Sequence, residues 1–428
     1  MPYELLLTDS TLIKDIKLEL ESEKKFVKPI YQDGRYKVIR TTITEDDHPL
    51  LAKQKSYLLR KYTAGRLCDK NDENNIVGFT RSFLKARNVA NFEELISHLP
   101  IRYTVYTPLL LFNNSKEKSF NHIKWREFFQ LVGLPVKDEY CKQMLSKVFV
   151  KLKLTHVAIN MPIIEADVMR RPFNIYPLYG ELVSPALDVR AEELWDSPTE
   201  TDFQSTLWCH TIQNGIHQYW APMFTMFSRG NIKEKKRILD KFQDIEGNDV
   251  VDMYAGIGYF TLCYLKRNAR KVYCFEINPW SVEALRKGLD ANAIDPQRCK
   301  IYNESNENCT ARIREAVTRK MRIRHINLGL LPTSKPSWPL ALEVIRLQYS
   351  TSSMNIVSLH IHENVHIIHL QDDSFITKTL NALKAIDKDM CYEAKHLERI
   401  KTFAPDIWHI CLDVDVKCLE LSSLVPLT

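Results

Sequence analysis

Two glycines and an acid in the segment 248–279 are the residues whose types and spacing point most directly to chemistry. Gly256 and Gly258 follow a continuous apolar strand, and Glu276 ends the second predicted strand, after an intervening helix. Glycines let the backbone approach a ligand closely, and a carboxylate at the tip of the following strand can accept hydrogen bonds from both hydroxyls of a ribose. The pattern predicts a site for a cofactor that contains adenosine.

The cofactor that fits this pattern is S-adenosylmethionine (AdoMet), which contains adenosine and lacks a pyrophosphate. A dinucleotide site requires glycine or alanine at the third position of the glycine fingerprint, but Thr261 stands there, so NAD is disfavoured. Asp252, in the strand before the turn, joins the two glycines and the acid as a predicted cofactor-binding residue. The alternative is an ordinary strand-to-helix turn in which Glu276 caps the following helix.

The next two strand ends add polar residues to the same site. Glu304 and Ser305 follow a predicted strand at 299–303, and Asn327 lies near the end of another at 322–328. Glu304 can accept a hydrogen bond from the adenine amino group, with Ser305 close to the same edge. Enzymes that methylate exocyclic amines often carry Asn/Asp-Pro-Pro-aromatic where this chain has Asn-Leu-Gly-Leu, so an amine acceptor is disfavoured.

A loop before the glycine turn predicts a carboxylate-binding site. Asn231 and Glu234 have the spacing of a capping box, which places the start of a helix at Ile232. The loop Ser228–Gly230 then lies at a helix N-terminus, where orphan N–H groups and the helix dipole favour negative charge. Lys235, one turn into the helix, adds a positive charge. A solvated basic helix is the alternative.

Strands and helices alternate from residue 249 onward, which is typical of an open parallel sheet covered by helices. In such sheets ligands bind beyond the carboxyl ends of the strands, so the residues above should meet at one edge. We predict an α/β fold: a doubly wound, Rossmann-like sheet of the class I AdoMet-dependent transferases, with a mixed α+β N-terminal region. The expected strands are 249–254, 271–276, 299–303, 322–328, 354–362, 393–402 and 408–416, and the expected helices are 259–268, 280–292, 310–320, 339–349 and 374–386.

Patterns before residue 226 are shorter. Tyr103–Phe112 predicts one strand interrupted by Pro108, and a helix that starts at Trp125 breaks at Gly133. Asn214–Gly215 predicts a hairpin turn. We expect three regions: an N-terminal region at 1–150, an α+β intermediate region at 151–225 and the AdoMet-binding catalytic domain at 226–428.

Charge and aromatic residues in the N-terminal region allow a nucleic-acid partner. The chain carries 59 basic and 53 acidic residues, a formal net charge of +6, which permits a phosphate-rich partner without requiring one. Lysine and arginine contact phosphate and aromatic rings stack on bases, although a solvated helix face has the same composition. The residues concerned are Lys53, Lys55, Arg60, Lys61 and Arg66, with Tyr57 and Tyr62 between them.

Composition disfavours several classes of protein. No apolar run approaches the roughly 18 residues needed to span a bilayer, and the first residues lack the basic segment of a signal peptide. The 10 cysteines show no CxxC spacing, so neither a zinc ribbon nor an iron–sulfur cluster has its usual ligands. We therefore expect a soluble, cytoplasmic protein with reduced thiols, no membrane segment and no metal.

Five segments together resemble the tRNA wybutosine-synthesizing protein 2 family, fungal type: AGIGYF, EINP, MFSRGNIKEKKR, INLGLLPTSKPSW and HIHENV. The resemblance is clearest over residues 155–416. It implies transfer of the 3-amino-3-carboxypropyl group of AdoMet to C7 of 4-demethylwyosine at position 37 of tRNA(Phe), in wybutosine biosynthesis, with release of methylthioadenosine. The partner that it implies is the anticodon region of tRNA(Phe), with the N-terminal region as a candidate for tRNA binding.

The resemblance also implies which residues bind AdoMet. Ser228 and Lys235 match the contacts to the methionine end, Glu276 the contact to the ribose, and Glu304 with Ser305 those to the adenine side, where most relatives have Asp-Asn. No general base is evident, and Asn327 is hypothesised to orient the acceptor base. Two alternatives are a tRNA guanine(37)-N1 methyltransferase from the sister group and a non-catalytic tRNA-binding protein. The oligomeric state is left open.

Overall fold

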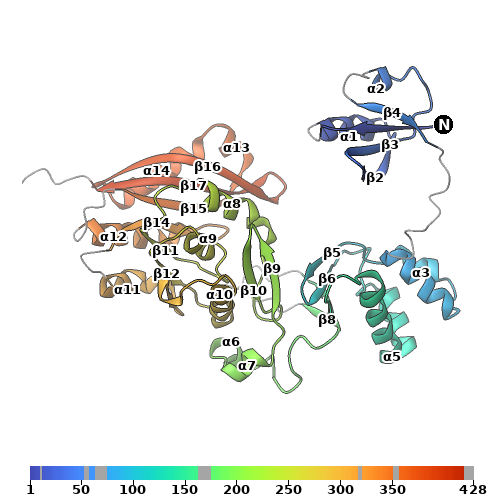
Figure 1. Cartoon of the computed structure of the whole chain (residues 1–428). Helices are drawn as coiled ribbons and strands as arrows, with labels where there is room; N and C mark the ends of the chain where they lie inside the picture. The colour runs from blue at the N-terminus through green and yellow to red at the C-terminus, as the bar shows by residue number, and fades with distance from the viewer. Residues whose placement is uncertain are drawn as a thin grey trace, which may run out of the picture. The chain divides into compact units, whose positions relative to one another are not determined.

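The computed structural model describes residues 1–9, 12–52, 57–62, 75–161, 175–316, 321–349 and 356–418. The chain separates into two compact units, Met1–Asn75 and Ile76–Thr428 (Figure 1). Three residues of the predicted basic stretch lie outside the described residues: Lys53, Lys55 and Arg66.

The first unit is a small antiparallel sheet with its own core. Its strands pair in the order β2-β3-β1-β4, and the core is built from apolar side chains such as Leu5, Leu20 and Ile39. The elements are β1 (Tyr3–Leu7), α1 (Ile13–Ser22), β2 (Phe26–Asp33), β3 (Tyr36–Thr41), α2 (Pro49–Ala52) and β4 (Leu58–Lys61).

Charged side chains on this sheet pair with one another. Glu4, only 2% exposed, accepts hydrogen bonds from Nε of Arg40 and Nε of Arg60, both at 2.8 Å. Lys61 Nζ lies 3.1 Å from Asp46 Oδ1. Two members of the predicted basic stretch, Arg60 and Lys61, are therefore in ion pairs, although their side chains keep much of their exposure.

The second unit begins with helices on a four-stranded sheet, whose strand order is β5-β6-β7-β8. The long helix α5 contains the predicted break, because Gly133 has φ 74° and ψ 170° and leaves the helical conformation. Trp125 and Tyr140 from this helix are fully buried in the core. The elements are α3 (Ile76–Ala86), α4 (Phe92–Ser97), β5 (Tyr103–Tyr106), β6 (Leu109–Asn113), α5 (Ile123–Val148), β7 (His156–Asn160) and β8 (Tyr176–Tyr179).

The segment Tyr103–Phe112 is a hairpin, so the prediction of one interrupted strand was wrong. β5 and β6 pair antiparallel, with Tyr103 opposite Phe112 and Tyr106 opposite Leu109. Proline has no N–H to donate to a sheet ladder, and Pro108 stands in the turn where no such bond is required. The proline thus reverses the chain instead of interrupting a strand.

Asn214 and Gly215 form the predicted hairpin turn, with φ values of 53° and 74°. Asn292 ties this hairpin to a later helix, since its Oδ1 accepts the His217 N–H at 3.0 Å and its amide donates to the His217 carbonyl at 2.7 Å. The hairpin strands are β9 (Cys209–Gln213) and β10 (Ile216–Trp220), and two short helices precede them, α6 (Glu192–Asp196) and α7 (Glu200–Gln204).

A seven-stranded sheet occupies the rest of the unit, in the order β13-β12-β11-β14-β15-β17-β16. The strands β11 to β15 are parallel, β17 pairs antiparallel with β15, and β16 pairs antiparallel with β17. The predicted doubly wound, Rossmann-like sheet is confirmed. Its strands are β11 (Asp249–Asp252), β12 (Lys271–Phe275), β13 (Cys299–Tyr302), β14 (Ile323–Leu328), β15 (Val357–His366), β16 (Met390–Ala404) and β17 (Ile407–Cys418).

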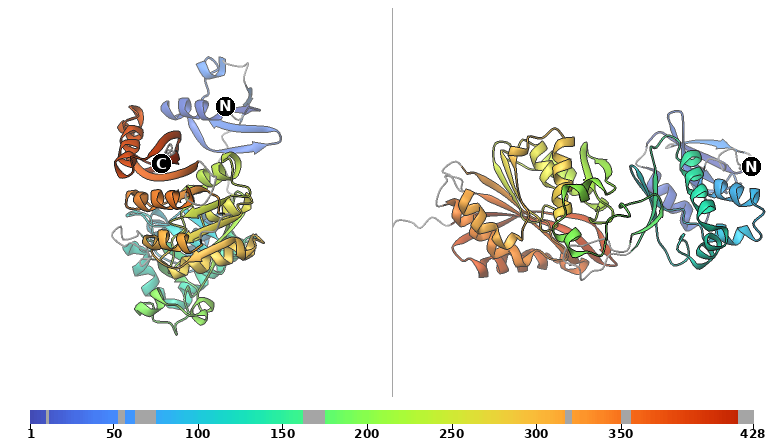
Figure 2. Two further views of the ribbon diagram at one scale, coloured as in Figure 1. Left: turned by 90° about the vertical axis from the view of Figure 1, so that its left-hand side faces the viewer. Right: turned by 90° about the horizontal axis from the view of Figure 1, so that it is seen from below.

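Helices cover both faces of this sheet (Figure 2). Val250 packs with residues of α8, α9 and α10, whereas Val251 packs with residues of α11, α12 and α14, because neighbouring residues of a strand face opposite sides. The helices are α8 (Ile232–Lys241), α9 (Thr261–Lys266), α10 (Pro279–Ala291), α11 (Cys309–Ala316), α12 (Trp338–Tyr349), α13 (Ile367–Gln371) and α14 (Ser374–Ile386). Among the described residues, no helix combines the length and apolar character needed to cross a membrane.

The region boundaries expected at residues 150 and 225 both fall inside the second unit. β6 and β7 lie on either side of residue 150 and pair in parallel, so a division there cuts one sheet. The two compact units divide between Asn75 and Ile76, and the expected division into three functional regions stays a prediction.

Candidate cofactor-binding site and active site

The carboxyl ends of β11, β12, β13 and β14 lie at one edge of the large sheet, because these strands are parallel neighbours. The glycine turn follows β11, Glu276 follows β12, and Glu304 follows β13, while Asn327 lies at the end of β14. The topology therefore brings these four predicted positions to the edge where doubly wound sheets bind ligands.

The turn after β11 has a shape that requires glycine. Gly256 has φ 54° and Gly258 has φ 85°. A Cβ atom on Gly258 would lie 2.5 Å from Cδ1 of Leu285, and one on Gly256 would lie 3.2 Å from the ring of Tyr259. The second glycine thus lets α10 pack against the turn, and the first lets the Tyr259 ring approach the turn closely.

The Glu276 carboxylate is fixed on this turn. It accepts the N–H of Gly256 at 2.8 Å and the N–H of Asn278 at 2.9 Å. Burial raises the pKa of Glu276 to about 7, although these hydrogen bonds act to lower it. The alternative in which Glu276 caps the next helix is wrong, because the α10 cap is the Asn278 side chain, which accepts the Trp280 N–H.

Asp252 of β11 and Asn327 of β14 hydrogen-bond to each other close to the glycine turn. Asp252 is fully buried and accepts hydrogen bonds from Thr261 Oγ1 at 2.7 Å and from Asn327 Nδ2 at 3.0 Å. Burial raises the pKa of Asp252. Because its carboxylate is covered and bonded within the protein, Asp252 holds the turn and Asn327 in place. Asn327 Oδ1 is buried and has no hydrogen-bond partner among the described residues.

Glu304 and Ser305 already have partners within the protein. The guanidinium of Arg312 bonds to both Glu304 oxygens and holds the pKa of that carboxyl below its usual range. Ser305 Oγ accepts the Glu307 N–H at 3.3 Å and caps a short 3₁₀ turn. Both residues lie at the expected strand end, and their contact with adenine stays a prediction.

The helix predicted to start at Ile232 does so, but without the predicted capping box. The Asn231 side chain makes no cap hydrogen bond, since a 3₁₀ turn, η2 (Arg229–Asn231), leads directly into α8. Glu234 instead bonds to Arg237, with distances of 2.9 and 2.6 Å to Nε and Nη2. The capping box was therefore wrong, because a buried arginine takes the carboxylate.

Lys235 is fully buried, which excludes the solvated-helix interpretation for this residue. Its Nζ donates to Oε1 of Gln218 at 2.6 Å and to Oε1 of Gln213, both on the β9–β10 hairpin. Burial lowers the pKa of Lys235 to about 8. The rings of Phe227 and Tyr259 lie 5.4 and 5.7 Å from the ammonium, so the charge sits beside the start of the Ser228 loop.

Lys401 lies at the Ser228 loop, and the sequence analysis did not predict it as a site residue. It comes from β16, and its Nζ donates to Ser228 Oγ at 3.3 Å. A Cβ atom on Gly230 would lie 2.2 Å from Lys401 Cδ, so the glycine makes room for the lysine stem. Burial lowers the pKa of Lys401. No local sequence pattern could have linked Ser228 to Lys401, because they are 173 positions apart.

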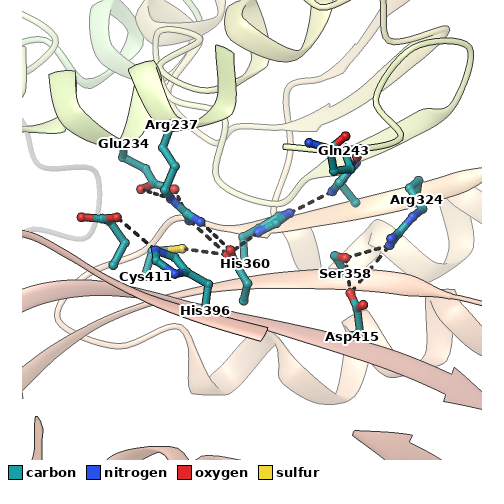
Figure 3. A network of polar contacts seen from close by, with 12 residues as sticks. Glu234, Arg237, Gln243, Arg324, Ser358, His360, His396, Cys411 and Asp415 are labelled. Atoms are coloured by element: carbon teal, nitrogen blue, oxygen red, sulfur yellow. Dashed lines mark hydrogen bonds and ion pairs between the residues drawn. The ribbon is translucent and has the colours of Figure 1, made fainter. Parts of the chain in front are cut away.

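A buried polar network anchors α8 to the large sheet (Figure 3). Arg237 of α8 joins the Glu234 carboxylate to the Asp413 carboxylate of β17. Asp413 also accepts a hydrogen bond from His360 at 2.7 Å, and His360 contacts His325 at 3.0 Å. The network fixes the helix that carries Lys235.

Two groups of side chains in this network have ligand atoms within 4.8 Å of one another: Glu234 with His362 and Cys411, and His360 with Cys411 and Asp413. Arg237 forms ion pairs with both carboxylates of these groups, so their charges are balanced within the protein. Both groups belong to the contacts that anchor α8 to β15 and β17.

The comparisons with known proteins agree with this arrangement. Residues 211–321 match the family model of the TRM5/TYW2 methyltransferase domain. The chain is 46% identical over 456 residues to tRNA wybutosine-synthesizing protein 2 of Saccharomyces cerevisiae, covering 97% of this chain and 98% of that protein. It is 35% identical over 336 residues to the Schizosaccharomyces pombe protein of the same name, covering 74% and 73%.

Solved structures show the same fold. A crystal structure of Pyrococcus horikoshii TYW2 in complex with MeSAdo covers 79% of this chain and 99% of its own, with a TM-score of 0.51 and 20% sequence identity. At that identity the likeness supports the fold alone.

Proposed function

This chain belongs to the tRNA wybutosine-synthesizing protein 2 family, and from that premise we propose that it transfers the 3-amino-3-carboxypropyl group of AdoMet to C7 of 4-demethylwyosine at position 37 of tRNA(Phe). The observation that carries the proposal is the Glu276 carboxylate, fixed by backbone N–H groups on the glycine turn. The reaction belongs to wybutosine synthesis, and its location in the cytoplasm is part of the proposal.

The residues present fit AdoMet. Glu276 holds its oxygens at the turn with lone pairs left for the ribose hydroxyls, and Gly256 lets the Tyr259 ring pack closely against the turn. Ser228, Lys235 and Lys401 supply a hydroxyl and two cations at the loop proposed to hold the methionine carboxylate. Glu304 and Ser305 lie at the strand end proposed to face the adenine, where Arg312 also bonds to the Glu304 carboxylate.

Positioning is the main contribution of the protein to this reaction. The sulfonium of AdoMet activates all three of its attached carbons, so the product depends on which carbon faces the acceptor. In the proposed reaction a bond forms between C7 and the γ-carbon of the methionine arm as the bond from that carbon to sulfur breaks. The electron pair stays on sulfur in methylthioadenosine, and the C7 proton is lost to solvent or base. The loop cations would hold the methionine arm in the orientation that exposes its γ-carbon.

Asn327 is proposed to orient the acceptor base. Asp252 holds the Nδ2 group of Asn327, which leaves Oδ1 as the atom able to accept a hydrogen bond. An amide is not a base at physiological pH, so this role is positioning and not proton removal. If Asn327→Ala leaves turnover unchanged, that role is excluded.

A tRNA guanine(37)-N1 methyltransferase is the second candidate, because the matching family model covers both TRM5 and TYW2. The deciding experiment incubates the protein with tRNA(Phe) that carries 4-demethylwyosine and with AdoMet labelled in its methionine backbone, followed by mass spectrometry of the nucleosides. Backbone label in the base, with methylthioadenosine released, supports the proposal. Label left in S-adenosylhomocysteine would mean methyl transfer instead. A Gly258→Val variant, in which a side chain would press on α10, is the inactive control.

The first unit is proposed to bind the tRNA body. It has its own core and carries Arg60 and Lys61 with partly exposed side chains. Removal of Met1–Asn75 should weaken tRNA binding while AdoMet binding to the second unit is preserved. An unchanged dissociation constant for tRNA would exclude this role.

A further inference from the structure

Lys235 carries a buried positive charge that the described part of the protein does not balance. Its Nζ donates to Oε1 of Gln218 at 2.6 Å and to Oε1 of Gln213, and both of these groups are neutral amides. The acid next to it in α8, Glu234, is bonded to Arg237. Among the described residues, no carboxylate forms an ion pair with Lys235. A pKa of about 8 leaves the amine protonated at neutral pH, and a buried charge is costly unless it is paired, so the ammonium requires an anion.

Gln218 adds a second donor beside this charge. An ammonium group has no acceptor, so the oxygen of the Gln218 amide must face Lys235. The Nε2 group of the same amide is buried and has no hydrogen-bond partner within the part of the chain that the structure describes. Buried polar groups are nearly always hydrogen-bonded in folded proteins, and two neighbouring groups that can only donate select an acceptor. Of the two charged groups on the methionine arm of AdoMet, they therefore favour the carboxylate over the ammonium.

This charge lies where the glycine turn meets the Ser228 loop. The Lys235 ammonium is 5.4 Å from the ring centre of Phe227 and 5.7 Å from that of Tyr259. Tyr259 directly follows Gly258 of the turn, and its hydroxyl accepts the Ser228 N–H at 3.0 Å. An anion held at this loop therefore has the Lys235 charge beside it, at the place proposed for the methionine carboxylate.

The proposed reaction leaves that carboxylate where it is. The bond from the γ-carbon to sulfur breaks while the bond from the same carbon to C7 forms, and the carbon that bears the carboxylate takes no part. The carboxylate therefore belongs to AdoMet before this step and to the tRNA base after it. Methylthioadenosine, the other product, has no carboxylate.

We propose that Lys235, held by Gln213 and Gln218, binds one carboxylate throughout the reaction, first on AdoMet and then on the modified base of the product tRNA. Gln213 is a positioning residue that acts through the lysine, whereas the Gln218 amide also donates to the carboxylate. The inference rests on the proposed function, because only transfer of the aminocarboxypropyl group carries the carboxylate to tRNA. It follows that the modified tRNA competes with AdoMet for this site.

The first test compares two ligands of the full-length protein by isothermal titration. Gln218→Glu places a carboxylate beside the ammonium, so the protein itself supplies the anion that the ligand otherwise brings. The variant should bind AdoMet about ten-fold more weakly, the lower end for hydrogen bonds to a charged group, and should bind methylthioadenosine as wild type does. Equal losses for the two ligands would mean general damage to the site and would overturn the proposal.

A second variant and a control accompany this comparison. Gln213→Glu makes the same change at the other glutamine and should produce the same difference between the two ligands, so the test does not depend on the folding of one variant. Gln297→Glu is the matched control, because Gln297 is exposed in the 3₁₀ turn η3 (Pro296–Arg298), before β13. It should leave both affinities unchanged. If Gln297→Glu weakens AdoMet binding as much as Gln218→Glu, the effect is one of net charge and the proposal fails.

The second test concerns the product tRNA. At saturating methylthioadenosine, wild type should bind tRNA(Phe) that carries the aminocarboxypropyl group about ten-fold more tightly than tRNA(Phe) that carries 4-demethylwyosine. The preference should be absent in Gln218→Glu. It should also be absent in wild type with S-adenosylhomocysteine, which keeps the carboxylate but has no sulfonium to drive transfer. Equal affinities of wild type for the two tRNAs with methylthioadenosine would overturn the proposal.

These readouts separate the inference from the proposed reaction. If the labelling experiment shows methyl transfer but Gln218→Glu still weakens AdoMet and not methylthioadenosine, the proposed reaction fails and the carboxylate site for AdoMet stands. If aminocarboxypropyl transfer occurs but Gln218→Glu weakens both ligands equally, or wild type does not prefer the modified tRNA, the inference fails and the reaction stands.

Discussion

Replacing Glu276 with glutamine tests the central contact of the proposed cofactor site. The carboxylate accepts the Gly256 and Asn278 N–H groups through separate oxygens. A glutamine amide keeps one of these acceptors and places an NH₂ group against the other N–H. It also removes the negative charge that should strengthen the hydrogen bonds from the ribose hydroxyls.

The expected size of the effect follows from these bonds. Hydrogen bonds to a charged group contribute about 1.5–3 kcal/mol, which corresponds to about a 10- to 150-fold weaker affinity for AdoMet. The single N–H left facing a donor should lower the free energy of unfolding by about 1–3 kcal/mol. Isothermal titration with AdoMet measures the first quantity, and urea unfolding measures the second.

The pH dependence supplies an independent check. Burial raises the pKa of Glu276 to about 7, so the carboxylate that accepts the ribose bonds forms as the pH rises through neutrality, and AdoMet affinity should rise with it. The stability contribution has the opposite sign: the folded protein holds this proton more tightly than the unfolded chain, so stability is lost as pH rises from 4.5 to about 7.

Comparing two variants shows whether Glu276 causes the pH dependence of AdoMet affinity. Glu246→Gln changes an exposed carboxylate before β11, at the amino end of the sheet, and should leave both affinity and its pH profile unchanged. Glu276→Gln should flatten the part of the wild-type profile that Glu276 causes. Wild-type affinity in Glu276→Gln, or an unaltered profile, would refute the assignment of this residue to the ribose.

Three further substitutions, the first with a matched control, test the surrounding structure. Gly258→Ala should lower the free energy of unfolding by about 1–3 kcal/mol, because its new methyl would lie 2.5 Å from a leucine side chain. Gly247→Ala, which has a positive φ but open space around it, should cost less in the same urea titration. Lys401→Ala should raise the KM for AdoMet and leave the KM for tRNA unchanged, and an unaltered KM for AdoMet would exclude Lys401 from the site. Asp413→Asn should destabilise the fold by about 3–5 kcal/mol, because Arg237 loses a buried partner. Burial acts to raise the pKa of Asp413, but His360 and Arg237 hold it below its usual range, so wild type should lose this contribution as pH falls below about 4, and Asp413→Asn should lose none.

The sequence by itself determined the parts of the site that depend on neighbours along the chain. The glycine turn, the acid after β12 and the alternation of strands and helices are local patterns, because each is set by backbone conformation or by the period of apolar residues. Asn214–Gly215 predicted its hairpin for the same reason, since both residues adopt positive φ readily. The parallel pairing of β11 to β15 then places the carboxyl ends of these strands on one edge.

Tertiary structure alone decided which side chains meet. Lys401 reaches Ser228 because β16 returns antiparallel beside β17, and no local pattern encodes that approach. Glu234 was predicted to cap a helix, yet Arg237 takes its carboxylate, and Arg312 pairs with Glu304, whose contact with adenine stays a prediction. An ion pair depends on which charged groups lie close together in the folded chain. A charged side chain can often reach several such groups, and the sequence does not say which one it contacts. Spacing along the sequence therefore identifies the residues at the site, and packing decides which of them remain available to a ligand.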